Sequence, residues 1–205
     1  MTKIKVCGLK RPEDITFANK YHPNYIGFVF AKSSRQVTPE TARELKALLD
    51  PDILSVGVFV NAPMEEISFL YKEGIIDLAQ LHGDESTEYL QQLKTLHPSL
   101  PTIRAVRVQS REQILEAEQL PCDYLLLDTW SPNAYGGSGH GFDKSLIPPL
   151  TKPWFLAGGL TPDNVCDNIL ACHPYGVDAS SSLESDGYKD KEKIKNFVEH
   201  IRRIG

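Results

Sequence analysis

The strongest constraint on the fold of this chain is an alternation, repeated eight times, between a short β-rich run and an amphipathic stretch. Successive runs start about 21 to 30 residues apart, which is the length of one strand-loop-helix-loop unit. A repeat of this kind predicts a mostly parallel sheet covered by helices. The eight runs are residues 3–7, 24–30, 53–59, 77–82, 102–108, 123–128, 154–157 and 176–179.

The stretches between the runs carry apolar residues at the spacing of one helix face. Helix starts are predicted where a capping hydroxyl precedes a first-turn proline, at Thr38-Pro39 and Thr161-Pro162, and at a capping box that begins with Ser110. The sixth helix, expected around residues 142–150, is cut short by Pro148-Pro149. The clearest apolar faces are Ala42, Leu45, Leu48 and Leu49, and Ile194, Phe197, Val198 and Ile201.

Eight such units fit either an open doubly wound sheet or a closed eight-stranded barrel. The count of eight, together with a composition that does not change along the chain, favours one (βα)8 TIM barrel domain over residues 1–205. Residues 189–195 are interpreted as the solvated start of the last helix. In a barrel of this type the chemistry belongs at the carboxyl ends of the strands and in the loops that follow them.

Composition narrows the class of partner. Lys and Arg number 22 and Asp and Glu 27, for a net charge of −5, which argues against nucleic-acid or anionic-membrane binding. No apolar run reaches the length of a membrane span, and residues 1–7 lack the features of a signal peptide. No two cysteines form a C-x-x-C pair, so we expect no metal site and reduced thiols in a cytoplasmic protein. The four cysteines are Cys7, Cys122, Cys166 and Cys172.

Two reactive side chains end predicted strands. Cys7 closes the first run, where a catalytic thiol needs a lowered pKa or a nearby base, and Lys5 shares its strand face. The alternative for Cys7 is a small buried hydrophobe. Asp128 closes the apolar run 124–127, where burial is expected to raise its pKa and let it act as an acid near neutrality. The alternative for Asp128 is a turn cap or a salt-bridge partner.

A phosphate site is predicted between the loops after the seventh and eighth runs. Gly158 and Gly159 let backbone N–H groups approach an anion, and Ser180 and Ser181 follow the eighth run. The glycine-dense segment 135–141 contains no G-x-G-x-x-G pattern, so a dinucleotide site is not expected. We interpret that segment as a mobile active-site loop.

Three further polar residues lie at predicted strand ends. The Arg35 fork suits a carboxylate, although arginines are common on surfaces. His82 follows the fourth run and is either a mouth residue or a hydrogen-bonded structural histidine. Asp178 points into the barrel or its rim, where a lone carboxylate needs a partner.

Taken in order, ten short motifs of this chain resemble those of the phosphoribosylanthranilate isomerase family, eight-stranded barrels of tryptophan biosynthesis. The resemblance extends from Lys3 to about Glu184. The motifs are KVCGL at 5–9, GFVF at 27–30, SSR at 33–35, VGVFVN at 56–61, QLHGDE at 80–85, LLD at 126–128, GGSG at 136–139, FD at 142–143, LAGGL at 156–160 and VDASS at 177–181.

The resemblance implies an Amadori rearrangement by acid/base catalysis, in which an N-(phosphoribosyl)aminobenzoate becomes an open-chain aminodeoxyribulose phosphate. It places the general base on Cys7 and the general acid on Asp128. A thiolate suffices beside an iminium, so no metal or redox cofactor is expected. The other implied contacts are Arg35 to the anthranilate carboxylate, His82 and Asp178 in the substrate pocket, and Gly158, Gly159, Ser180 and Ser181 to the phosphate.

Three positions depart from the family pattern. Ser182 stands where the family has a glycine, His140 where it has Lys or Arg, and Lys144 where it has Trp. If that glycine requires a positive φ, Ser182 introduces strain or the loop bends differently.

Two other interpretations of the chain remain open. One is a different phosphosugar enzyme on the same barrel, such as a ribulose-phosphate epimerase or an indoleglycerol-phosphate synthase. The other is a non-catalytic barrel that binds a phosphorylated ligand. The expected partner is a small-molecule phosphosugar substrate, and the expected assembly is a monomer or a homodimer.

Overall fold

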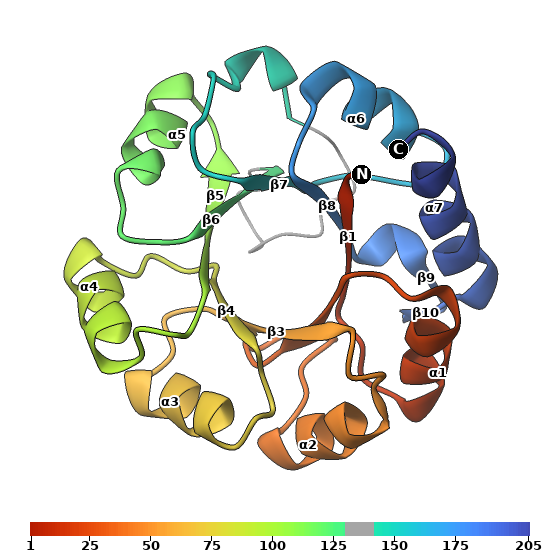
Figure 1. Cartoon of the computed structure of the whole chain (residues 1–205), viewed down its shortest axis with the longest axis horizontal. Helices are drawn as coiled ribbons and strands as arrows, with labels where there is room; N and C mark the ends of the chain where they lie inside the picture. The colour runs from red at the N-terminus through yellow and green to blue at the C-terminus, as the bar shows by residue number, and fades with distance from the viewer. Residues whose placement is uncertain (130–141) are drawn as a thin grey trace.

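Eight parallel strands close into a barrel, with β8 pairing back to β1. The computed structural model describes residues 1–129 and 142–205, and shows the ring of strands surrounded by helices (Figure 1). The barrel predicted from the sequence is therefore confirmed, with strand ends shifted by at most one residue. The strands are β1 (Lys3–Cys7), β2 (Tyr25–Val29), β3 (Leu54–Phe59), β4 (Leu78–Leu81), β5 (Thr102–Val108), β6 (Tyr124–Thr129), β7 (Trp154–Leu156) and β8 (Gly176–Ala179).

Seven α-helices cover the barrel in the described parts of the chain. The helix expected over 142–150 is reduced to the 3-10 turn η1 (Lys144–Leu146), because Pro148 and Pro149 carry no N–H with which to continue it. The helices are α1 (Pro12–Tyr21), α2 (Pro39–Leu48), α3 (Met64–Lys72), α4 (Thr87–Leu96), α5 (Arg111–Glu118), α6 (Val165–Cys172) and α7 (Lys191–Arg203).

Two of the three predicted helix starts are confirmed. Thr38 Oγ1 accepts a hydrogen bond from the Thr41 amide at 3.2 Å, and Ser110 forms the expected capping box that opens α5. At Thr161 the predicted capping hydroxyl is present, because Thr161 Oγ1 accepts a 3.3 Å hydrogen bond from the Asn164 amide and the Asn164 side chain accepts one from the Thr161 amide. The regular helix α6 nevertheless begins only at Val165, after a turn over residues 162–164.

The strands alternate between two cores. Side chains such as Val6 and Leu125 face the helices, while others such as Ile103, Leu126 and Phe155 fill the barrel interior. On α2 the buried residues are Ala42 and Leu45. The predicted apolar face is therefore wrong at Leu48, which is 55% exposed at the end of the helix.

Aromatic rings fill the amino-terminal end of the barrel. The Phe155 ring lies 5.4 to 5.9 Å from those of Tyr25, Tyr124 and Tyr175, and the hydroxyls of Tyr25 and Tyr175 are 3.0 Å apart. In the described residues this end is a packed plug, and the carboxyl ends of the strands are the end at which a barrel of this type places its ligand site.

A second turn and a hairpin connect β8 to α7. The turn η2 (Ser181–Leu183) is followed by strands β9 (Glu184–Ser185) and β10 (Tyr188–Lys189), which pair antiparallel. The prediction that residue 189 belongs to a solvated helix start is wrong, because its side chain is fully buried. No helix of the described residues is long and apolar enough to cross a membrane.

Candidate active site

A cavity of about 320 Å³ opens at the carboxyl end of the barrel. It lies between the ends of β6, β7 and β8, and its size suits a small ligand. Six residues that the sequence predicted for the site line this one cavity. They are Asp128, Gly158, Gly159, Asp178, Ser180 and Ser181.

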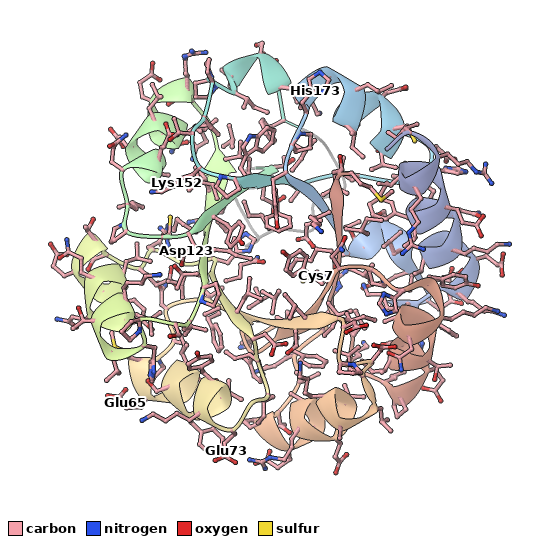
Figure 2. The ribbon with its side chains drawn as sticks, viewed as in Figure 1. Cys7, Glu65, Glu73, Asp123, Lys152 and His173 are labelled. Carbon is pink, nitrogen blue, oxygen red and sulfur yellow. The ribbon has the colours of Figure 1, made fainter. Side chains whose placement is uncertain are left out.

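Cys7 ends β1 at the same mouth. Its side chain lies inside the ring of strands (Figure 2) and is almost completely buried. The neighbouring strand leaves room for it, because a Cβ on Gly27 would lie 2.6 Å from the Cys7 Sγ. The Ser180 hydroxyl donates a 2.9 Å hydrogen bond to the Cys7 carbonyl, which joins the end of β1 to the cavity loop.

Burial sets the protonation of the thiol. Desolvation raises the pKa of Cys7, and the positive charges of Lys5 and Lys189 offset only part of that rise. The positive potential expected from Lys5 is present, but Lys5 also forms a 2.9 Å ion pair with Asp178, the partner that Asp178 required. Burial alone would lower the pKa of Lys5, yet Asp178 and Cys7 raise it. The lysine therefore stays charged beside the sulfur.

Asp128 is held from both sides at the end of β6. Its Oδ1 accepts a 2.8 Å hydrogen bond from the Thr129 amide, and its Oδ2 lies 3.4 Å from Nε2 of His82. The other ring nitrogen of His82 is 3.1 Å from Nε2 of Gln80. The His82 and Asp128 atoms are close but not aligned for a hydrogen bond, so His82 Nε2 is a buried polar atom without such a partner in the described residues.

The loop after β7 presents backbone donors to the cavity. Gly158 has φ +81°, and a Cβ there would lie 2.2 Å from Thr129 Oγ1 and 3.0 Å from Asp128 Oδ1. Only a glycine fits so close to the end of β6. Within the described residues the amides of Gly158 and Gly159 donate no hydrogen bond, which leaves both available for an anion.

Ser182 does not produce the strain considered from the sequence. Among the described non-glycine residues with positive φ, Ser182 is absent, so the 3-10 turn η2 accommodates it without a left-handed backbone. Its hydroxyl donates to the Leu160 carbonyl and thereby ties the loop after β8 to the loop after β7.

Sequence reasoning missed the partners of Arg35. The Arg35 guanidinium donates two hydrogen bonds to Glu184, at 2.7 and 2.9 Å, and Lys189 Nζ lies 2.6 Å from the same carboxylate. Gln80, which contacts His82, was also missed. The one signal that could have located Lys189 is the Asp186-Gly187 pair, which is typical of a hairpin turn.

Two other positions singled out from the sequence have separate outcomes. The segment 135–141, with His140, lies outside the described residues. Lys144 folds back on Phe142, with its Nζ 3.4 Å from the Phe142 carbonyl and 5.7 Å from the centre of the ring.

Comparison with known proteins identifies the family. Residues 4–200 match the family model for N-(5'-phosphoribosyl)anthranilate (PRA) isomerase. The chain belongs to this family. A PRA isomerase of Lachnoclostridium phytofermentans is 47% identical over 209 residues, which cover 96% of this chain and 95% of that protein. The PRA isomerase of Streptococcus mutans is 44% identical, covering 99% of this chain and all of that protein.

Solved PRA isomerase structures share the fold over the whole chain. The Thermus thermophilus enzyme superposes with a TM-score of 0.88 at 32% identity and covers 100% of both chains. A PRA isomerase in complex with reduced 1-(o-carboxyphenylamino)-1-deoxyribulose 5-phosphate has a TM-score of 0.82 at 30% identity, covering 99% of this chain and 100% of that one. The 3-hexulose-6-phosphate synthase of Salmonella typhimurium, at 14% identity and TM-score 0.75, shares the fold alone.

Proposed function

We propose that this chain isomerises N-(5'-phosphoribosyl)anthranilate to 1-(2-carboxyphenylamino)-1-deoxyribulose 5-phosphate by acid/base catalysis. The observation that carries the proposal is one mouth that unites a thiol, a carboxyl group and a glycine loop with open backbone donors, in a chain of the PRA isomerase family. An aldose-to-ketose rearrangement needs an acid at the ring oxygen, a base at C2 and an anchor for the phosphate.

Asp128 starts the reaction as the general acid. It gives a proton to the furanose ring oxygen, the bond from that oxygen to C1 breaks, and the amine nitrogen lone pair forms a C1 iminium. The carboxyl group suits this step because it lies at the cavity wall, is 6% exposed, and has one oxygen fixed by the Thr129 amide. Nε2 of His82 lies 3.4 Å from the other oxygen, without a hydrogen bond between them.

Cys7 continues the reaction as the general base. Its thiolate takes the proton from C2, and the electrons of that bond form the C1–C2 double bond of an enol as the iminium is neutralised. The enol then loses its hydroxyl proton while C1 gains one, which leaves the C2 ketone. Across the cycle Asp128 regains a proton and Cys7 loses one, so both end as they began. Because burial raises the pKa of Cys7, the thiolate is a minority form at neutral pH, and Lys5 supports it.

The two ends of the substrate have separate anchors. The phosphate binds to the amides of Gly158 and Gly159 and to the Ser180 and Ser181 loop, which line the cavity together. The anthranilate carboxylate binds to Arg35, whose stem lies beside Gly8 and Ser180 at the end of β1.

The test follows the loss of fluorescence of freshly made phosphoribosylanthranilate. We expect Cys7→Ala and Asp128→Asn each to lower kcat by about 100- to 10,000-fold, which is the usual contribution of a general base or acid. Urea unfolding should show little change in stability for either variant. Near-normal turnover of Cys7→Ala would remove the base assignment, and near-normal turnover of Asp128→Asn the acid assignment.

We further propose that the chain acts as a single domain in the cytoplasm, as a monomer or a homodimer. The supporting observation is that its four cysteines are free thiols, as suits a reducing compartment. Light scattering of the native protein distinguishes a monomer or homodimer from a larger assembly.

A further inference from the structure

Arg35 carries a carboxylate on one side of its guanidinium and has a free edge on the other. Its Nε donates to Glu184 Oε1 at 2.7 Å and its Nη2 to Glu184 Oε2 at 2.9 Å. A guanidinium has five N–H donors, and in the described residues Nη1 makes no hydrogen bond. The Nη1–Nη2 edge can therefore receive a second carboxylate in a parallel, bidentate contact.

A buried lysine completes the cluster. Lys189 Nζ lies 2.6 Å from Glu184 Oε1 and donates to the Ser180 carbonyl at 3.0 Å, and its side chain is fully buried. Two cations thus share one carboxylate, so the cluster carries a net charge of +1. Although burial alone would raise it, Arg35 and Lys189 lower the pKa of Glu184 to about 2, which keeps the carboxylate ionised. One more carboxylate would neutralise the cluster.

The cluster lies at the mouth. A Cβ on Gly8, the residue after Cys7, would lie 2.5 Å from Arg35 Cδ and 3.1 Å from Ser180 Oγ. The stem of Arg35, the loop after β8 and the end of β1 therefore meet at one point. Arg35 and Glu184 are 149 residues apart in the chain, and their side chains are 23% and 10% exposed, so the pair is partly buried.

We propose that Glu184 and Lys189 are positioning residues that fix the Arg35 fork, so that its free edge selects an aromatic amine with a carboxylate beside the nitrogen. This inference rests on the proposed function. Glu184 sets the plane of the fork, and Lys189 holds Glu184 against the loop that binds the phosphate. The position of the Arg35 fork relative to the phosphate loop is thereby fixed beside the end of β1.

The decisive comparison uses two substrates. One is the phosphoribosyl adduct of anthranilate, and the other is the adduct of aniline, which lacks the carboxylate. Glu184→Gln keeps the shape of the side chain. It removes the negative charge and replaces one of the two oxygens that accept hydrogen bonds from Arg35 with an NH2 group. We expect KM for the anthranilate adduct to rise about tenfold, since a charge-assisted pair is lost, and kcat/KM for the aniline adduct to stay within about twofold.

The direction in which KM changes distinguishes a positioning role of Glu184 from an effect of its charge alone. Glu184→Gln makes the mouth more positive, so a site that acted only through its field would bind the anthranilate adduct more tightly and KM would fall. That result would overturn the proposal. The matched control is Glu73→Gln, which removes the same charge from a half-exposed pair with Arg43 at 3.0 Å. This variant should leave the kinetic constants for both adducts unchanged.

Two further variants test whether Glu184 acts through Arg35. Arg35→Met should lose the preference for the anthranilate adduct over the aniline adduct. The Arg35→Met, Glu184→Gln double variant should have the same kcat/KM for the anthranilate adduct as Arg35→Met alone. Additive losses, or equal losses on both substrates, would assign Glu184 a merely structural role. If circular dichroism shows that Glu184→Gln does not fold, Glu184→Asp, which keeps the charge but shortens the reach, should give the same selective rise in KM.

Failure of the inference is distinguishable from failure of the proposed function. An unaltered protein that does not turn over the anthranilate adduct contradicts the function itself. An unaltered protein that turns it over, while Glu184→Gln leaves the preference between the two adducts intact, contradicts only the role of Glu184.

Discussion

At the scale of single residues, Gly158 connects the backbone of the site to its chemistry. Its left-handed φ of +81° turns the chain after β7, and the absent Cβ lets the loop touch Thr129 and Asp128 at the end of β6. Any side chain there meets two penalties, one from the backbone and one from the contact. Because Gly158 has no side chain, the proposed phosphate loop can pack directly against the proposed general acid.

This predicts that two glycine-to-alanine variants differ in how much unfolding free energy they lose. Gly158→Ala should lower the free energy of unfolding by more than about 2 kcal/mol and raise KM, because left-handed strain adds to a clash at 2.2 Å with Thr129 Oγ1. The control is Gly74→Ala, where φ is +67° but nothing lies within 4 Å of the added Cβ, so only about 1 kcal/mol of strain is expected. Urea unfolding and steady-state kinetics measure both, and equal losses would contradict the contact argument.

The residues that sequence reasoning located are those whose position follows from the strand ends. Cys7 and Asp128 each end a β-rich run, and in a parallel barrel all such ends meet at one mouth. Glu184 was missed because its partner Arg35 lies 149 residues away in the chain, and Lys189 because a local pattern of charges does not reveal its burial. Local sequence predicts position along an element, whereas ion-pair partners follow from the closure of the whole barrel.

At the scale of elements, the β9–β10 hairpin explains why a run of charges was misinterpreted. Asp186 and Gly187 both have positive φ, as a tight two-residue hairpin turn requires. The alternation along β10 then sends neighbouring side chains to opposite faces. Tyr188 stacks under Lys10 and Arg11 at 4.7 and 4.1 Å, while Lys189 enters the mouth.

The hairpin should make part of the stability sensitive to acid. The pKa of Glu184 is lowered from 4.5 to about 2, so its contribution is complete above pH 4.5 and is lost as the pH falls through about 2. The stability difference between the native protein and Glu184→Gln, measured by urea unfolding, should shrink by about 2 kcal/mol between pH 6 and pH 2.5. For Glu73→Gln the difference should stay below about 0.5 kcal/mol at both pH values. A Glu184→Gln difference that is constant with pH would contradict the ion-pair assignment.

At the scale of the whole molecule, one end of the barrel contributes mainly to stability and the other end carries the proposed active site. The amino-terminal end is closed by Phe155 and three tyrosines, whereas the carboxyl end holds the buried charges Lys5, Asp128 and Asp178. Buried charges contribute little net stability, because desolvation offsets their attraction. The apolar plug therefore supplies the packing that allows the mouth to hold its charged groups in place.

Substitution at the plug should affect folding and leave turnover intact. Phe155 is fully buried and contacts all three tyrosine rings, so Phe155→Leu should lower the free energy of unfolding by about 1 to 3 kcal/mol through lost ring contacts and a residual cavity. Below the unfolding transition kcat should stay within about twofold, because the ring lies at the end of the barrel opposite Cys7. Phe69→Leu, at a ring that is 46% exposed, should change stability by less than about 0.5 kcal/mol. A large fall in kcat for folded Phe155→Leu protein would mean that the two ends are coupled and that the division does not hold.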